Sequence, residues 1–177
     1  MAVLAFEIEL SDMRRGRYET LSFTVAQHPS ESEAYLVTRV LAFALEQEEG
    51  LAFSKGGLGE AEEPALSVTD LTGRRTAWIE VGLPSAERLH RASKASDRVA
   101  VWPHRDASAW FRQLAGARIH RAADITVHSL DLALIDAVAG VLTRRNTLAL
   151  TVSEDELFLE LAGRSFTGAL VERPLVE

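Results

Sequence analysis

The sequence predicts an α+β fold in which a mixed β-sheet is flanked by helices. Strand-like and helix-like segments are interspersed along the 177 residues, and several strand connections are too short for the crossovers that parallel pairs need. Hydrophobic residues make up 47% and charged residues 25% of the chain, as in ordinary globular proteins with a sizeable core. We therefore expect a single domain over residues 1–177.

The N-terminal part is expected to form two strands and a helix. Residues 3–10 and 17–27 alternate apolar and polar side chains on either side of a polar turn, which predicts two neighbouring strands. A helix is expected to follow and to run to about Gln47. Ser30 is its expected N-cap, because Glu33 stands three residues later and completes a capping-box pattern.

The middle of the chain is expected to form a β-hairpin over residues 64–83. Its turn is the sequence DLTG at 70–73, where an aspartate in the first position and a glycine in the fourth suit a type I turn. Pro84 then begins a predicted helix that leads to the short apolar strand VAVW. The remaining predicted elements are helices at 106–114 and 130–140, a strand at 125–128, and an antiparallel meander from Thr147.

Composition narrows the classes of function. The formal net charge is −7, so no general attraction to nucleic acid or to an anionic membrane is expected, although a local basic helix keeps a nucleic-acid partner open. The chain has no cysteine, which excludes disulfides and thiolate metal sites. It has no apolar run of about 20 residues and no basic, apolar leader at its N-terminus. These features predict a cytoplasmic protein.

One acidic residue stands out in the second strand of the hairpin. In RRTAWIEVGLPS, at 74–85, Glu80 lies between an isoleucine and a valine and close to Trp78. A buried unpaired carboxylate is costly, so Glu80 must have a partner. Two alternatives remain open: an ion pair with an arginine, or a divalent cation shared with a second acid. Glu63 is the expected second acid, because it can lie on the same face one strand away.

Four motifs carry a resemblance to a known family. HPSE at 28–31, EEP at 62–64, DLTG at 70–73 and WIEVGLP at 78–84 occur in this order, with a basic helix and an apolar strand after the last. The chain resembles the YaeQ family of bacterial proteins over essentially its whole length. That family is similar in fold to the PD-(D/E)XK nuclease superfamily, which implies a restriction-endonuclease-like core with additional antiparallel strands.

The resemblance implies a metal site for phosphodiester hydrolysis. Its ligands are expected to be Glu31, Glu80 and the backbone carbonyl of Val81, together with Glu63, the second acid that the hairpin offers. The ion is expected to be Mg²⁺, with Mn²⁺ as a substitute, which polarises the phosphate and activates a water molecule.

The resemblance also implies a catalytic cation beside Glu80. Gly82 stands where the superfamily has a lysine, and the following helix offers Arg88, Arg91 and Lys94. Of these, Lys94 or Arg91 is expected to supply the positive charge. These two residues are three apart and share a helix face.

One departure argues against hydrolysis. The family commonly places an acid after the proline of EEP, but Pro64 is followed by Ala65. Two functions therefore compete: a Mg²⁺-dependent, nuclease-like phosphodiesterase, and a non-catalytic binding module for a protein or nucleic-acid partner. In a third interpretation the acids only form structural ion pairs.

Overall fold

The computed structural model describes residues 2–54 and 63–176. Its strands are β1 (Ala2–Asp12), β2 (Arg17–Gln27), β3 (Leu51–Phe53), β4 (Leu66–Thr69), β5 (Arg75–Val81), β6 (Arg98–Trp102), β7 (Thr126–Leu130), β8 (Arg145–Ser153), β9 (Glu156–Leu161) and β10 (Arg164–Pro174). Its helices are α1 (Glu33–Leu45), α2 (Ala86–Ala95), α3 (Ser108–Leu114) and α4 (Leu132–Ala139), with a short 3-10 helix η1 (Ala122–Asp124).

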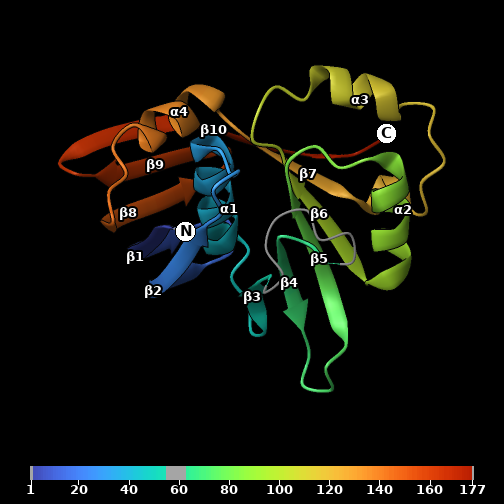
Figure 1. The fold of residues 1–177 in the computed structure, drawn as a ribbon, viewed down its shortest axis with the longest axis horizontal. Helices are drawn as coiled ribbons and strands as arrows, with labels where there is room; N and C mark the ends of the chain where they lie inside the picture. Colours follow the sequence, from blue (N-terminus) through green and yellow to red (C-terminus); the bar gives the residue numbers. More distant parts are fainter. Residues whose placement is uncertain (1, 55–62, 177) are drawn as a thin grey trace.

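The described strands form one mixed sheet in the order β2-β1-β8-β9-β10-β7-β6-β5-β4-β3. The pairs β1–β8, β5–β6 and β6–β7 are parallel, and the other pairs are antiparallel. Figure 1 shows helices packed on this sheet. The predicted α+β class, a mixed sheet flanked by helices, is confirmed. The likeness to the nuclease core stays a prediction.

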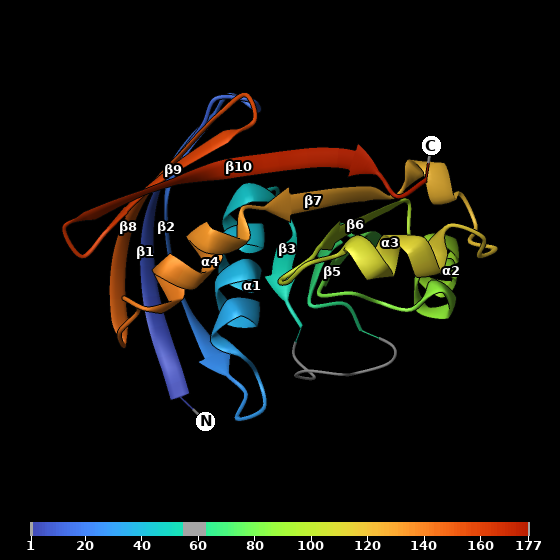
Figure 2. The same ribbon diagram turned by 90° about the horizontal axis from the view of Figure 1, so that it is seen from above.

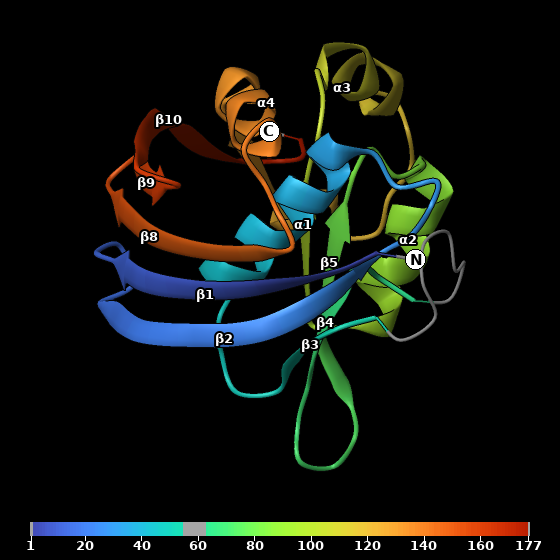
Figure 3. The same ribbon diagram turned by 60° about the vertical axis from the view of Figure 1, so that its left-hand side comes forward.

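Half of the sheet curves around α1. In Figure 3, β1, β2 and β8 wrap the helix as one curved layer. Alternation explains this placement, because Leu4, Phe6, Ile8 and Leu10 of β1 are buried, while the polar residues between them face outward. The predicted N-terminal strand pair is confirmed by eleven paired positions between β1 and β2.

The other half of the sheet is covered on both faces. Ile79 of β5 belongs to the same apolar cluster as Leu36 and Val40 of α1, whereas Trp78 packs with Leu89 of α2 in a second cluster. The two halves are joined by β10, which pairs with β9 over residues 164–169 and with β7 over residues 170–174 (Figure 2). As a result, β5 lies between two apolar layers.

The predicted start of the first helix is corrected. Helix α1 begins at Glu33, and its N-cap is Ser32, whose hydroxyl accepts a hydrogen bond from the Tyr35 amide at 3.1 Å. Ser30 contacts His28 instead, with 2.7 Å between Oγ and Nδ1. Because the capping hydroxyl comes two residues later than expected, Glu31 stands in the turn before the helix. None of the described helices is long and apolar enough to cross a membrane.

Candidate functional site

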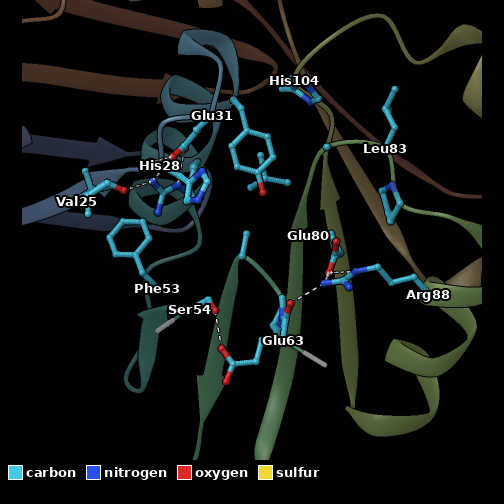
Figure 4. A pocket seen from close by; sticks show the side chains of 18 of the residues that line it. Val25, His28, Glu31, Phe53, Ser54, Glu63, Glu80, Leu83, Arg88 and His104 are labelled. Carbon is cyan, nitrogen blue, oxygen red and sulfur yellow. Dashed lines mark hydrogen bonds and ion pairs between the residues drawn. The ribbon is translucent and has the colours of Figure 1, made fainter. Parts of the chain in front are cut away.

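A pocket of about 620 Å³ opens at the carboxyl end of β5. Figure 4 shows its walls: His28 and Glu31 lie on the side of α1, whereas Glu80 and Arg88 lie opposite, on β5 and α2. Phe53, Ser54 and Glu63 line the space between them. Since β5 and β6 are parallel, the loops after both strands reach this edge, where open α/β sheets bind their ligands.

Glu80 is held by two donors that contact one oxygen of its carboxylate. The Trp78 indole donates to Oε1 at 2.6 Å, and Arg88 Nε donates to the same atom at 2.9 Å. Arg88 Nη2 is also 2.9 Å from Oε1 and donates to the backbone carbonyl of Glu63 at 2.6 Å. Of the two partners left open for Glu80, the structure therefore contains the arginine.

Burial dominates the electrostatics of this acid. Glu80 is 6% exposed, and burial raises the pKa of its carboxyl above the ordinary value, although Arg88 and Trp78 act in the opposite direction. The ion pair with Arg88 therefore offsets only part of the desolvation of the carboxylate.

Glu31 forms a second ion pair on the opposite wall. Arg39 donates from Nε to Oε2 at 3.0 Å and from Nη2 to Oε1 at 2.9 Å, the bidentate geometry of a strong arginine–carboxylate pair. The His28 amide donates to Oε1 at 3.1 Å. Three donors thus surround Glu31, which ties the HPSE turn to the helix.

Glu63 does not face Glu80 across the hairpin. Leu66 pairs with Ile79 and Val68 with Ala77, so the same register places Ala65 opposite Glu80. The carboxylate of Glu63 accepts a hydrogen bond from Ser54 Oγ at 2.6 Å, and in Figure 4 it points toward Ser54. The expectation that Glu63 lies beside the Glu80 carboxylate is corrected, because two residues of offset move its side chain along the strand direction.

The basic residue beside Glu80 is Arg88, and neither Arg91 nor Lys94 lines the pocket. The Arg91 side chain is 51% exposed and lies 3.5 Å from Glu87, and Lys94 is exposed. The expected position of Arg91 or Lys94 is therefore corrected. Arg88 stands in the first turn of α2, next to the end of β5. Each later turn lies about 5.4 Å farther along the helix axis, which places Arg91 and Lys94 farther from this strand end.

Val81 and Gly82 line the pocket, and the expected role of the Val81 carbonyl as a metal ligand stays a prediction. The Gly82 amide donates to the carbonyl of Trp102 at 2.9 Å. Its φ of +112° favours glycine over any L-residue. A lysine at position 82 would therefore strain the backbone at the point where β5 leaves the sheet.

Tyr35 and His104 line the pocket and were not among the predicted site residues. Their rings meet edge to face, with centroids 5.4 Å apart. Burial raises the pKa of Tyr35 to about 12, and the negative charge of Glu80 is the second-largest cause of this rise. Burial also lowers the pKa of His104, and the positive charge of Arg105 is the second-largest cause.

Two sequence signals could have identified these residues. Tyr35 and Arg39 are four residues apart on α1, the repeat that places side chains on one helix face, and Glu31 stands in the turn just before this helix. His104 follows the apolar strand β6, at the same edge of the sheet as Glu80.

Among the described residues, no three His, Asp or Glu side chains are grouped closely enough to hold a metal ion. Both oxygens of Glu31 and one oxygen of Glu80 already accept hydrogen bonds from protein donors. Ala65 and Gly82 supply no side-chain ligand or charge at the two positions where a nuclease-like site was expected to have an acid and a lysine.

The fold and the pocket define a small α+β protein whose candidate site is built from two arginine–carboxylate pairs at the edge of a mixed sheet. The family model for YaeQ protein matches residues 1–169. The chain therefore belongs to the YaeQ family, as the four motifs predicted.

Known relatives agree with this assignment. Two proteins called "Uncharacterized protein YaeQ", from Salmonella typhi and Escherichia coli (strain K12), are each 29% identical over 154 residues, which span 86% of this chain and 84% of the relative. The crystal structure of the YaeQ protein from Xanthomonas axonopodis pv. citri has a TM-score of 0.89 at 31% identity, over 98% of both chains. The YaeQ protein from Pseudomonas syringae has a TM-score of 0.84 at 28% identity, over 96% of this chain and 93% of that one. The relatives are bacterial, and the cytoplasmic location stays a prediction.

Proposed function

We propose that this protein is a ligand-binding member of its family, and that its pocket does not hydrolyse phosphodiesters with Mg²⁺. One observation carries the proposal: each buried acid of the pocket is already neutralised by an arginine, Glu31 by Arg39 and Glu80 by Arg88. A guanidinium group takes the position beside each carboxylate that a metal ion would need.

The energetics of metal binding support this proposal. Mg²⁺ demands near-ideal octahedral geometry with oxygen ligands, and Glu80 would have to exchange Arg88 for the ion. Removing a charge from a buried pair leaves the other charge uncompensated, at a cost of about 3–5 kcal/mol. The second carboxylate that the nuclease motif uses to offset this cost is replaced by Ala65.

The competing function is a Mg²⁺-dependent nuclease in which Arg88 replaces the motif lysine. The observation that favours it is the contact between Arg88 and Glu80, since a cation beside the motif acid is what phosphoryl transfer uses to stabilise developing charge.

Cleavage assays separate the two functions. Wild-type protein, Glu80→Gln and a control, Glu156→Gln on the exposed side of β9, are incubated with single-stranded DNA, double-stranded DNA and RNA in Mg²⁺ or Mn²⁺. We expect no cleavage that depends on Glu80, and no heat of Mn²⁺ binding that differs between wild type and Glu80→Gln. Cleavage by wild type and Glu156→Gln that is lost in Glu80→Gln would overturn the proposal.

A further inference from the structure

The pocket contains polar atoms that the protein itself does not use. All contacts to the Glu80 carboxylate reach Oε1, and Oε2 accepts no hydrogen bond from any residue in the described ranges. The hydroxyl of Tyr35 likewise has no hydrogen-bond partner within these ranges. Neither atom is fully enclosed by the described residues, so both can be reached by a ligand that enters the pocket.

His104 adds a third unsatisfied group beside Tyr35. Its Nδ1 is buried without a hydrogen-bond partner among the described residues. The backbone of Gly82 lies against both rings, because a Cβ built there would be 3.6 Å from Tyr35 Cε2 and 3.7 Å from His104 Nδ1. His104 therefore packs against Tyr35 and limits where the phenol ring can turn.

The acceptor atoms left in the pocket favour a cation. Glu80 Oε2 belongs to a carboxylate, and a carboxylate accepts most strongly from a charged N–H group. In a partly desolvated site a single charge acts more strongly than it would in water.

The number of available acceptor atoms indicates the kind of cation. A guanidinium ligand binds a carboxylate best through both oxygens, but Oε1 of Glu80 is already taken. Mg²⁺ is usually held by one or two carboxylates together with several waters, and Glu31 is enclosed by three donors. A primary ammonium is a compact charge whose N–H groups act singly, so it suits one free carboxylate oxygen and one hydroxyl.

The rest of the lining is apolar. Val25, Phe53, Pro64, Val81 and Leu83 contribute to the walls, and the volume of about 620 Å³ lies within the range of small-molecule sites. A ligand that fills this space therefore needs an apolar group as well as a charge.

We propose that the pocket binds a small primary amine in its ammonium form, with its N–H groups donated to Glu80 Oε2 and to the Tyr35 hydroxyl and its apolar group against Phe53 and Leu83. The inference takes its location from the proposed function, because both concern the same pocket. The tests are independent, since ligand binding is measured without a metal or a nucleic acid.

Calorimetry with three probes of equal chain length tests the proposal. Hexylamine, hexanol and hexanoate are titrated into the full chain at pH 7, where the amine is charged. We expect hexylamine to bind more tightly than hexanol, and hexanoate to bind most weakly. Equal affinity for hexylamine and hexanol would reduce the site to an apolar cavity, and tighter binding of hexanoate would make it an anion site. Either result, or no hexylamine binding at millimolar concentration, overturns the proposal.

Two variants locate the ammonium. Glu80→Gln removes the charged acceptor, and we expect affinity for hexylamine to fall about tenfold or more, since hydrogen bonds to charged groups are the strong ones. Tyr35→Phe removes the hydroxyl, and a fall of about threefold to tenfold is expected. Glu156→Gln, outside the pocket, should bind as wild type does.

The readouts remain usable if one variant misfolds. Should Glu80→Gln fail to give a cooperative thermal transition, Tyr35→Phe and the comparison of the three probes still decide. Hexylamine affinity that is unchanged in a folded Glu80→Gln or in Tyr35→Phe would contradict the assigned contacts. Phosphodiester cleavage with Mg²⁺ would overturn the proposed function but leave the amine measurements valid.

Discussion

Replacement of Arg88 by methionine should destabilise the protein far more than the same change at Arg91. Arg88 and Glu80 have side chains that are 20% and 8% exposed, respectively. The variant loses the contacts of Nε and Nη2 with Oε1, both 2.9 Å, and the 2.6 Å hydrogen bond to the Glu63 carbonyl. A buried carboxylate left with only the Trp78 indole implies a loss of about 3–5 kcal/mol in the free energy of unfolding.

Arg91 offers a matched control on the same helix. Its pair with Glu87 has side chains that are 51% and 82% exposed, and exposed pairs of this kind contribute about 0.3–0.5 kcal/mol. Urea unfolding of wild type, Arg88→Met and Arg91→Met at pH 7 measures the difference. The double variant Arg88→Met with Glu80→Gln should recover part of the loss, with a coupling energy of about 1–3 kcal/mol.

The pH dependence sharpens this test. Without Arg88, the charged form of Glu80 has lost its cation, so the pKa of the carboxyl must rise further than in the wild type. The loss caused by Arg88→Met should therefore shrink as the pH falls and Glu80 takes up a proton. Equal losses for Arg88→Met and Arg91→Met, or a loss for Arg88→Met that is the same at pH 5 and pH 8, would refute the reasoning.

Three further variants test the remaining parts of the site. Because burial raises the pKa of Glu80 above its ordinary value of 4.5, the folded state holds this proton more tightly than the unfolded state. Wild type should therefore lose stability as the pH rises from about 4.5 through the raised pKa. Thermal melts of Glu80→Gln should lack this fall. Parallel curves of melting temperature against pH for the two proteins would contradict this prediction. Glu31→Gln leaves the Arg39 guanidinium, which is 11% exposed, without its carboxylate. This variant should lose about 3–5 kcal/mol in the free energy of unfolding in urea, whereas Glu33→Gln, at an exposed position, should lose about 0.5 kcal/mol or less. Similar losses in the two variants would show that the pair is not structural. Gly82→Lys places a lysine where the resemblance to the nuclease superfamily would have one, but forces an L-residue to a φ of +112°. We therefore expect a loss of about 1–3 kcal/mol in the free energy of unfolding, a similar loss for Gly82→Ala, and no DNA cleavage with Mg²⁺. A stable Gly82→Lys that cleaves DNA would reverse this interpretation.

The two departures from the expected nuclease pattern share one physical feature. Ala65 and Gly82 flank Glu80 in space and along the chain, and neither carries a polar side chain. At the same place the protein has Arg88 in contact with Glu80 and Tyr35 beside Gly82. This arrangement retains a buried acid but places an arginine, and no second acid, in contact with it.

Much of the fold was predictable because it depends on local pattern. Alternation along β1 correctly gave its buried face, and the DLTG turn was correctly placed, with the Gly73 amide donating to the Asp70 carbonyl at 3.0 Å. The family assignment also came from the sequence, through four short motifs in a fixed order. In each case the decisive interactions lie within a few residues of one another, so the chain itself carries the signal.

The tertiary structure decided which groups meet. The sequence showed that Glu80 needed a partner but not which one, since Arg88, Arg91 and Lys94 differ only in their distance along one helix. Ala65, and not Glu63, is opposite Glu80, and this register includes a one-residue shift at the bulge between Val68 and Thr69, which the sequence does not reveal. Tyr35 and His104 come together only when α1 packs across the ends of β5 and β6. Pairing across such distances is set by packing of the whole core, and side-chain spacing along the chain therefore cannot determine it.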